Sequence, residues 1–234
     1  MIRLENITLA FDSKVLLQGA ACHFAAGTLT ALVGRNGAGK SSLLRILAAI
    51  DTPTAGDVLV GGKALRDIPT EERAKAISFV STQRVRVANL LCRDVVATGR
   101  APYTNWIGRI SSEDREIISQ SLSAVGMEAF ANRAIDTLSD GEFQRVMIAR
   151  ALAQQTPIIL LDEPTAFLDI PTRFEICRLL ADLAHNQGKT IIFSTHDIDA
   201  AMAVCNNVAI MDNRSISLYS TTEAVDILKV LFSL

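Results

Sequence analysis

The chain has 234 residues and a mass of 25.3 kDa, which suits one substantial domain rather than two large ones. Hydrophobic residues make up 49% of it and charged residues 21%, a balance that excludes a mainly disordered or collagen-like chain. The net charge of −2 argues against nucleic acid as a partner. Because no apolar run reaches the roughly 18 residues of a membrane span and the first residues lack a signal peptide, we expect a cytosolic protein.

The first third of the chain is predicted to consist mainly of strands. Alternating apolar residues predict a strand over residues 2–11 with a bulge near residues 5–6, which suggests an antiparallel start. The apolar run 28–33 predicts a second strand that leads into a glycine-rich loop, and residues 43–49 have helical character. Further strands are predicted over residues 57–60 and 76–80.

Residues 84–155 differ from the flanking sequence because their pattern is mainly helical. Ser111 and Asp114 have the spacing of a capping box, and Gly126 is placed to end the helix that follows. We therefore interpret residues 84–155 as a helical insertion within a single domain of residues 1–234.

Parallel α/β order is expected to return after this insertion. A buried strand is predicted over residues 158–161, a helix from Pro171 and a further strand over residues 190–194. Residues 221–234 predict a short amphipathic helix with Thr222 as its N-cap. The core is therefore predicted to be α/β.

A glycine-rich loop between the second predicted strand and the first helix matches the pattern GxxxxGK[ST]. Glycines let backbone N–H groups close around phosphates, and a lysine together with the helix N-terminus adds positive potential. Ser41 is expected to hold Mg²⁺. The residues expected to bind the nucleotide here are Gly34, Arg35, Asn36, Gly37, Ala38, Gly39, Lys40, Ser41 and Ser42.

The buried strand 158–161 ends in two carboxylates, Asp162 and Glu163, and ligands of parallel sheets gather at the carboxyl ends of the strands. Asp162 suits the magnesium shell, and Glu163 is placed to polarise or deprotonate the water that attacks a γ-phosphate. Alone, such a pair is more often a solvated strand end. The phosphate loop upstream favours the catalytic interpretation.

With these motifs the chain resembles the ATPase subunit of an ABC (ATP-binding cassette) transporter over essentially its full length. Residues 138–142 are similar to the LSGGQ signature of that family and lie between the phosphate loop and the Asp-Glu strand, as the resemblance requires. The resemblance implies an α/β fold with a P-loop NTPase (RecA-like) core, an antiparallel β subdomain and an inserted α-helical subdomain.

The resemblance also assigns roles to single residues. Gln83 corresponds to the Q-loop, which implies a catalytic role and a place in the magnesium shell. His196 corresponds to the switch histidine that contacts the γ-phosphate, residues 166–169 to the D-loop, and Phe11 to the aromatic residue that stacks on adenine. Lys40, Glu163, Gln83 and His196 are together expected to be the catalytic residues.

In the family, the signature loop reaches across a head-to-tail homodimer to the partner's γ-phosphate, which implies nucleotide contacts for Ser139 and Gly141. The chain departs from the family pattern there, because Asp140 and Glu142 stand where glycine and glutamine are common. Added negative charge is expected to weaken closure on ATP unless these carboxylates point away or are paired. The adenine-stacking residue is phenylalanine rather than the commoner tyrosine.

Residues 95–103 and 152–154 are similar to stretches found in importers of iron chelates (siderophores), haem and cobalamin. This implies a peripheral ATPase on the cytoplasmic side of the inner (plasma) membrane that powers a separate permease, with a substrate-binding protein in the complete system. The segment from Gln83 to Trp106, with Tyr103, is expected to receive a cytoplasmic helix of the permease.

Two alternatives compete with the importer interpretation. One is a soluble ABC ATPase without transport, in iron–sulfur assembly or translation. The other is a P-loop kinase, which would leave residues 139–142 and His196 without roles. Fold and catalytic motifs alone do not identify the transported ligand.

Overall fold

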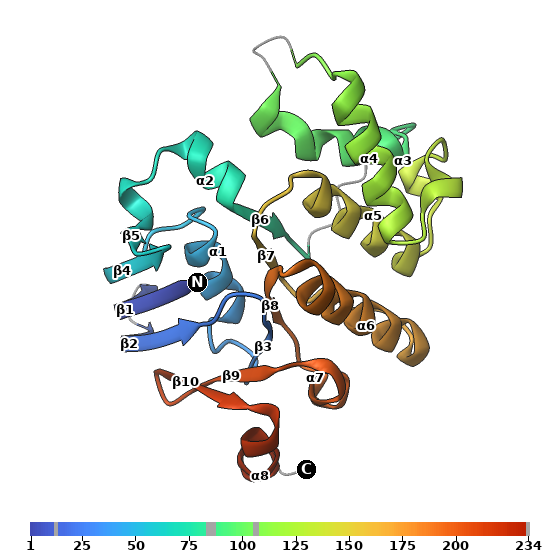
Figure 1. Ribbon diagram of the computed structural model, residues 1–234. Coiled ribbons are helices and arrows are strands. Elements are labelled where there is room, and N and C mark those ends of the chain that lie inside the picture. Colours follow the sequence, from blue (N-terminus) through green and yellow to red (C-terminus); the bar gives the residue numbers. More distant parts are fainter. Residues whose placement is uncertain (12–13, 83–87, 105–107, 233–234) are drawn as a thin grey trace.

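The computed structural model describes residues 1–11, 14–82, 88–104 and 108–232, without the side chains of Phe11 and Phe232. Its strands form two sheets with helices packed around them (Figure 1). The strands are β1 (Ile2–Phe11), β2 (Lys14–Phe24), β3 (Leu29–Gly34), β4 (Ala55–Val60), β5 (Lys63–Ala64), β6 (Ile77–Val80), β7 (Ile158–Leu161), β8 (Thr190–Ser194), β9 (Asn207–Asp212) and β10 (Ser215–Ser220). The α-helices are α1 (Lys40–Leu47), α2 (Thr70–Ala76), α3 (Cys92–Ala97), α4 (Ser112–Ala124), α5 (Asp140–Ala153), α6 (Ile170–Gln187), α7 (Ile198–Val204) and α8 (Thr221–Phe232).

The two sheets differ in strand direction. The four-stranded sheet has the order β2-β1-β4-β5 and is antiparallel throughout. The six-stranded sheet has the order β10-β9-β3-β8-β7-β6, and every neighbouring pair in it is parallel except β9 with β10. The predicted α/β class with an antiparallel part is thereby confirmed. The central order β3-β8-β7 places the carboxyl ends of these three strands side by side.

The central strands of the six-stranded sheet are buried on both faces. In β8, Ile191 and Phe193 belong to the core shared with α5 and α6, whereas Ile192 between them belongs to the core shared with α1 and the antiparallel sheet. This alternation follows from the two-residue period of a strand. Every residue of β3, β7 and β8 is buried, which explains why these strands are almost continuously apolar in sequence.

Short helices occupy most of the described part of residues 84–155 and lie together beyond β6 (upper right in Figure 1). A buried ion pair holds them: Arg100 Nε donates to Asp114 Oδ1 at 2.8 Å, and both side chains are less than 10% exposed. Arg100 Nη1 also donates to the carbonyl oxygen of Ala153 at 2.7 Å, which ties the end of α5 to the same point. The capping box of Ser111 and Asp114 is present as predicted.

Two local expectations have different outcomes. The bulge in β1 is confirmed, since its register against β2 shifts between Leu4 and Ile7 and Asn6 has a φ of 53°. The expected N-cap at Thr222 is wrong. The last helix begins at Thr221, two residues earlier than that cap requires, and the side chain of Ser220 accepts from the Glu223 N–H at 3.4 Å. Glu223 Oε2 in turn accepts from the Ser220 N–H at 2.9 Å, so the capping box is displaced by two residues.

Candidate functional site

The phosphate loop joins β3 to α1 and holds a lysine inside it. Gly39 has a φ of 99° directly before the helix, a left-handed conformation that favours glycine. The Lys40 side chain turns back into the loop, where Nζ donates to the carbonyl oxygens of Gly34 at 2.9 Å and Arg35 at 3.4 Å. Burial lowers the pKa of Lys40, while the charges of Glu163 and Asp162 act in the opposite direction. The ammonium therefore lies within the electrostatic reach of both carboxylates.

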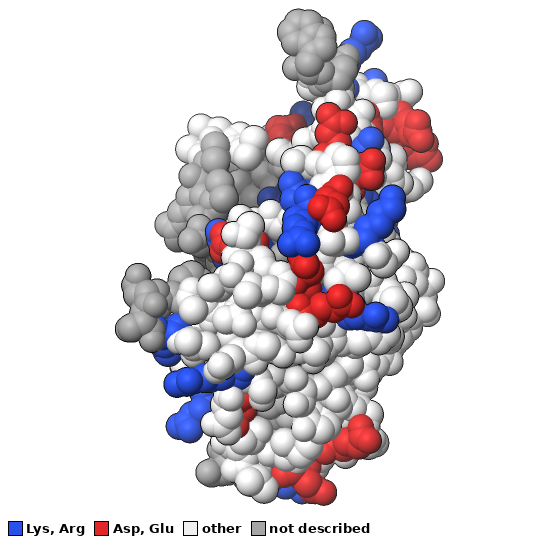
Figure 2. Space-filling view, turned by 90° about the vertical axis from the view of Figure 1, so that its left-hand side faces the viewer, with Lys and Arg blue, Asp and Glu red and all other residues white. Residues whose placement is uncertain are grey.

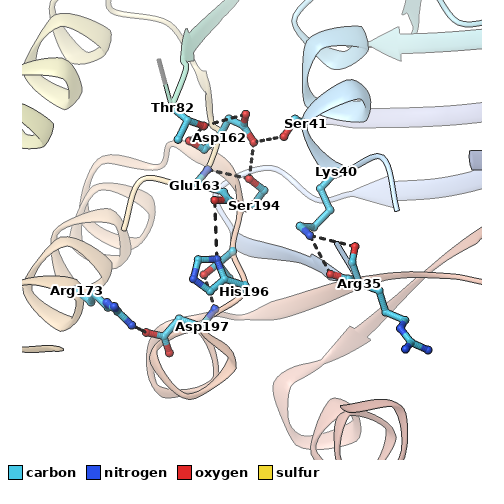
Figure 3. A network of polar contacts seen from close by, with 12 residues as sticks. Arg35, Lys40, Ser41, Thr82, Asp162, Glu163, Arg173, Ser194, His196 and Asp197 are labelled. Carbon is cyan, nitrogen blue, oxygen red and sulfur yellow. Dashed lines mark hydrogen bonds and ion pairs between the residues drawn. The ribbon is translucent and has the colours of Figure 1, made fainter. Parts of the chain in front are cut away.

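The carboxylate of Asp162 is oriented by three hydroxyl groups from different parts of the chain (Figure 3). Its Oδ1 accepts from Ser41 Oγ at 2.8 Å and from Ser194 Oγ at 2.7 Å. Its Oδ2 accepts from Thr82 Oγ1 at 3.1 Å. The structure thus joins the start of α1, the end of β8 and the segment after β6 at the residue that follows β7.

Glu163 and His196 lie next to this carboxylate. The N–H of Glu163 donates to Ser194 Oγ at 2.8 Å, and Glu163 has a φ of 46°, which is uncommon for a residue with a side chain. Glu163 Oε2 lies 3.9 Å from His196 Nδ1, and the two side chains are 30% and 56% exposed. Both groups are therefore accessible to a bound molecule while the backbone that carries them is held.

The sequence analysis missed two of the residues that orient this site. Ser194 is completely buried and contacts both Asp162 and Glu163, although it was noted only as part of the segment before His196. Thr82 was not singled out at all. A hydroxyl residue at the end of a strand that neighbours the Asp-Glu strand is the signal that could have found Ser194, once the strand order is known.

Positive charge gathers on the outer side of the phosphate loop. Lys14, Arg35 and Arg214 line a hollow of about 200 Å³ beside Gly37, with Asp212 as the acidic member of its lining. Lys14 Nζ donates to the carbonyl oxygen of Gly37 at 3.4 Å. Figure 2 shows basic side chains gathered low on the left of this face, whereas both signs mix over its upper part. An anionic polyphosphate is attracted to such a potential.

The signature residues lie at the start of α5, at another place in the molecule. Ser139 is the N-cap, and its Oγ accepts from the Glu142 N–H at 3.3 Å. Gly141 packs so closely on α6 that a Cβ there would lie 2.7 Å from Thr172 Cγ2, so a larger residue would force Thr172 to shift. The hollow beside them is lined by residues 139–142 and by residues of the D-loop and α6, and none of the residues that line it belongs to the phosphate loop.

One departure from the family signature is accommodated within the chain. Glu142 Oε2 accepts from the Ser139 N–H at 2.8 Å, and Arg133 Nη1 lies 3.7 Å from Glu142 Oε1. The hydrogen bond from this N–H is the main cause that holds the pKa of Glu142 below its usual value. The extra carboxylate therefore completes a capping box and is paired, and Asp140, two residues before it, is the other acidic residue in the first turn of α5.

Three of the predicted site residues lie wholly or partly outside the described residues. Gln83 is one, and the side chain of Phe11, at the end of β1, is another. The anchor residue Trp106 is the third. Ser42 lies in the first turn of α1, next to Ser41. The structure thus brings Lys40, Ser41, Asp162, Glu163 and His196 together, and it holds Ser139 and Gly141 apart from them.

The chemistry of the donors fits Mg²⁺. The cation prefers hard oxygen ligands, and it is usually bound through one or two carboxylates together with phosphate oxygens and water. The hydroxyl of Ser41 and the carboxylate of Asp162 are such donors and already lie 2.8 Å apart. Within the described ranges, His, Cys, Asp and Glu form no cluster of three that could hold a metal without a phosphate.

A phosphate-binding loop after β3, an acidic pair after β7 and a parallel sheet behind them define a P-loop nucleotide hydrolase. The family profile for ABC transporters matches residues 17–166. The chain is 39% identical to the Probable siderophore transport system ATP-binding protein YusV of Bacillus subtilis, over 91% of this chain and 78% of that protein. The chain belongs to the ABC transporter family as an ATP-binding subunit, and the predicted family and ATPase class are confirmed.

Two solved structures have the same fold over nearly the whole chain. One is an inward-facing conformation of a proposed metal-chelate type ABC transporter, with a TM-score of 0.87 and 28% identity, over 100% of this chain and 89% of that chain. The other is the dimeric ATP-binding cassette MJ0796 in a post-hydrolysis state bound to ADP and Pi, with a TM-score of 0.81 and 30% identity, over 94% of this chain and 99% of that chain. Among the described residues, no helix is both long and apolar enough to cross a membrane.

Proposed function

We propose that the chain binds ATP at the carboxyl ends of β3, β7 and β8 and hydrolyses it there. The observation that carries the proposal is the convergence of Lys40, Ser41, Asp162, Glu163 and His196, which lie far apart in sequence, on one edge of the parallel sheet. Phosphoryl transfer needs positioned charge more than covalent chemistry. Lys40 supplies fixed positive charge to the phosphates, and the N–H groups of residues 34–41 surround them.

The residues then divide the work of hydrolysis. Ser41 and Asp162 would hold Mg²⁺ with Gln83, and the ion would neutralise charge that develops on the phosphates. Glu163 polarises the attacking water or accepts a proton from it. Its side chain is 30% exposed, so a water molecule can reach the carboxylate. His196 contacts the γ-phosphate, and the ring of Phe11 stacks on adenine. Residues 84–155 form the inserted helical subdomain of the single domain.

The signature residues act on a second copy of the chain. In a head-to-tail homodimer, Ser139 and Gly141 of each subunit face the γ-phosphate bound by the partner. The hydroxyl of Ser139 accepts from Glu142, so its proton is still available to a phosphate oxygen. The similar cassette that is dimeric with ADP and Pi supports this arrangement.

We propose further that the ATPase energises an importer for an iron chelate, haem or cobalamin and lies on the cytoplasmic side of the plasma membrane, with a substrate-binding protein in the system. The resemblance to YusV and to a metal-chelate type transporter supports this cargo class. A hollow of about 410 Å³ between α3 and α4 suits a cytoplasmic helix of the permease. Ala97, Ile110, Ile118 and Leu122 give it an apolar floor, and Arg93, Asp94, Arg115 and Glu128 supply its charged groups.

Tyr103 contributes less to this surface than the sequence suggests. Its hydroxyl donates to the carbonyl oxygen of Gln154 at 3.1 Å, and its ring lies 4.0 Å from the guanidinium carbon of Arg100. These contacts bind the ring to the helical segment, although 39% of the residue is exposed. The docking proposal therefore depends on the hollow between α3 and α4 rather than on Tyr103.

The importer proposal is tested by isolating the tagged chain from detergent-solubilised membranes and by measuring uptake in a deletion strain. We expect a polytopic membrane protein to copurify, and we expect uptake of at least one of a ferric siderophore, haem or cobalamin to be lost. Ala97→Glu should abolish copurification, because Ala97 is a half-buried residue of the hollow and glutamate there places a charge in its apolar floor. Undiminished uptake of all three ligands, with no second ATPase present, would favour the alternative of an ABC ATPase without transport.

A further inference from the structure

Arg173 connects two segments that carry the proposed catalytic residues. It lies near the start of α6, and its Nε donates to the carbonyl oxygen of Leu168 at 2.7 Å. Its Nη1 donates to Asp197 Oδ2 at 3.2 Å. Leu168 ends the turn that begins at Glu163, and Asp197 follows His196 directly. Figure 3 shows the Arg173 side chain reaching Asp197, next to His196.

The segment from Glu163 to Leu168 is a tight turn. The Ala166 N–H donates to the carbonyl oxygen of Glu163 at 3.1 Å, and the Leu168 N–H donates to that of Thr165 at 3.4 Å. Glu163 and Phe167 both have positive φ angles, of 46° and 64°. Side chains disfavour this conformation, so the turn keeps its shape because the surroundings hold it. The bond from Arg173 is one of the contacts that do so.

The segment around His196 is anchored on both sides of the histidine. The Thr195 N–H donates to the carbonyl oxygen of Leu32 at 3.1 Å, which attaches the segment to β3. Asp197 Oδ1 accepts from the Ala200 N–H at 3.1 Å and caps α7, so its other oxygen is turned to Arg173. A shift of Asp197 would therefore displace the histidine next to it.

We propose that Arg173 is a positioning residue for ATP hydrolysis, which keeps Glu163 and His196 at their working separation. This inference rests on the proposed function. The planar guanidinium directs Nε and Nη1 in fixed directions and can serve a carbonyl and a carboxylate together, which a lysine cannot do in the same geometry. Apart from that of His196, the proposed phosphate contacts are made from α1 and the loop before it, so the main effect falls on the chemical step rather than on ATP binding.

The test compares steady-state Mg-ATP hydrolysis by the full chain and its variants. For Arg173→Ala we expect kcat to fall about 10- to 100-fold, since small misplacements of reacting groups have effects of that order, while KM stays within about twofold. Arg173→Lys should recover part of kcat. Arg178→Ala is the matched control, because Arg178 is exposed on the same helix and forms no side-chain hydrogen bond or ion pair within the described ranges. It should behave like the wild type.

A second pair of variants separates positioning from general stability. Asp197→Asn keeps the oxygen that caps α7 and loses the charge that faces Arg173, so adding Arg173→Ala to it should lower kcat no further than Arg173→Ala does alone. If Arg173→Ala melts at a lower temperature, Arg173→Gln replaces it, because the amide keeps a donor for Leu168. An unchanged kcat in the Arg173 variants, or a rise in KM at constant kcat, would overturn the proposal. A wild-type chain no more active than Lys40→Ala would contradict the proposed function as well.

Discussion

The two halves of the proposed catalytic site are held by different kinds of contact. At the sheet edge, Ser41 and Asp162 bond across 121 positions of sequence, and Ser194 joins them from the neighbouring strand. At the start of α5, Ser139 and Glu142 bond to each other three positions apart. Ser194 is completely buried, whereas Ser139 is exposed.

This difference indicates which half can act within one chain. The sheet-edge half is assembled by the tertiary fold, so its donors are already oriented before a nucleotide arrives, and little reorganisation is needed. The α5 half is a locally capped helix start that faces outward beside the D-loop, and it needs a second surface to reach a phosphate. Changes at the sheet edge should therefore affect chemistry strongly, and changes at α5 should affect association or stability.

The largest effect is expected for Lys40→Ala. Removing the ammonium from inside the phosphate loop takes away the nearest fixed cation, and hydrolysis should fall by about 10³-fold or more. Lys189→Ala is the control, because Lys189 is also a partly buried lysine that donates to a carbonyl oxygen, that of Thr156, at 2.8 Å. It should hydrolyse ATP normally. Near-normal turnover by purified Lys40→Ala would contradict the assignment of residues 34–41 as the phosphate site.

Glu163→Gln should stop the chemical step while ATP remains bound. General base groups contribute about 10²- to 10⁴-fold, and we expect kcat to fall within that range. Trapped ATP should then hold two copies together through Ser139 and Gly141, so a dimer should appear in size-exclusion chromatography with Mg-ATP. If only monomer elutes, Asp140→Gly in the same background decides whether the charge of Asp140 prevents closure. If that change restores the dimer, the result supports a site completed by Ser139 and Gly141 of the second copy.

Asp114→Asn tests what holds the helical part that carries α5. Hydrogen bonds from the Ser111 N–H and from Arg100 lower the pKa of Asp114 from 3.8 to about 2. A depressed carboxyl pKa stabilises the fold above the unfolded pKa, so this stabilisation should be lost as the pH falls from about 5 to about 2. At neutral pH the variant should lose about 3 kcal/mol of the free energy of unfolding, because Arg100 stays buried without its partner.

Denaturant titrations at pH 7 and pH 3 measure the Asp114 effect. The difference between wild type and Asp114→Asn should shrink at the lower pH, since the carboxyl of the unfolded chain is then largely protonated and the fold, which holds it ionised, gains less from its depressed pKa. Glu113→Gln is the control, because Glu113 is an exposed carboxylate in the same first turn. A difference that is equal at both pH values would contradict the role of the Asp114 charge.

Phe11→Ala should weaken ATP binding with little effect on kcat. Stacking of a base on an aromatic ring is worth about 1–3 kcal/mol, so KM should rise about tenfold. Phe11→Tyr and Phe11→Trp keep the π-face and should retain the wild-type KM. Equal affinities in all three variants would show that Phe11 belongs to the core instead of the nucleotide site.

The smallest effect is expected for Glu142→Gln. Glutamine can also complete a capping box, so the free energy of unfolding should change by less than about 0.5 kcal/mol. Because Glu142 is paired within its own chain, the rate of hydrolysis should also stay close to that of the wild type. A clear rise in ATP-driven dimer formation would show that the Glu142 charge faces the partner, and this would revise the comparison of the two halves.

The sequence by itself determined the motifs and most elements of the parallel core. The phosphate loop and Asp162 with Glu163 were found because each is a short pattern beside a predictable strand, whereas the signature and His196 were assigned through the resemblance to the ABC family. Strands such as β7 and β8 were predictable because burial on both faces makes them continuously apolar. The capping box at Ser111 is local in the same sense, and it was also found.

Only the tertiary structure decided which residues meet. β9 and β10 were not predicted, since antiparallel pairing at the edge of a sheet depends on a distant neighbour more than on local preference. The contacts of Thr82, Ser194 and Arg173 follow from the strand order β3-β8-β7-β6, which brings loop ends from distant parts of the chain to one edge. Side chains that act through long-range hydrogen bonds leave no local pattern in sequence. For that physical reason the motif residues of the proposed site could be predicted from sequence, and the residues that orient them could not.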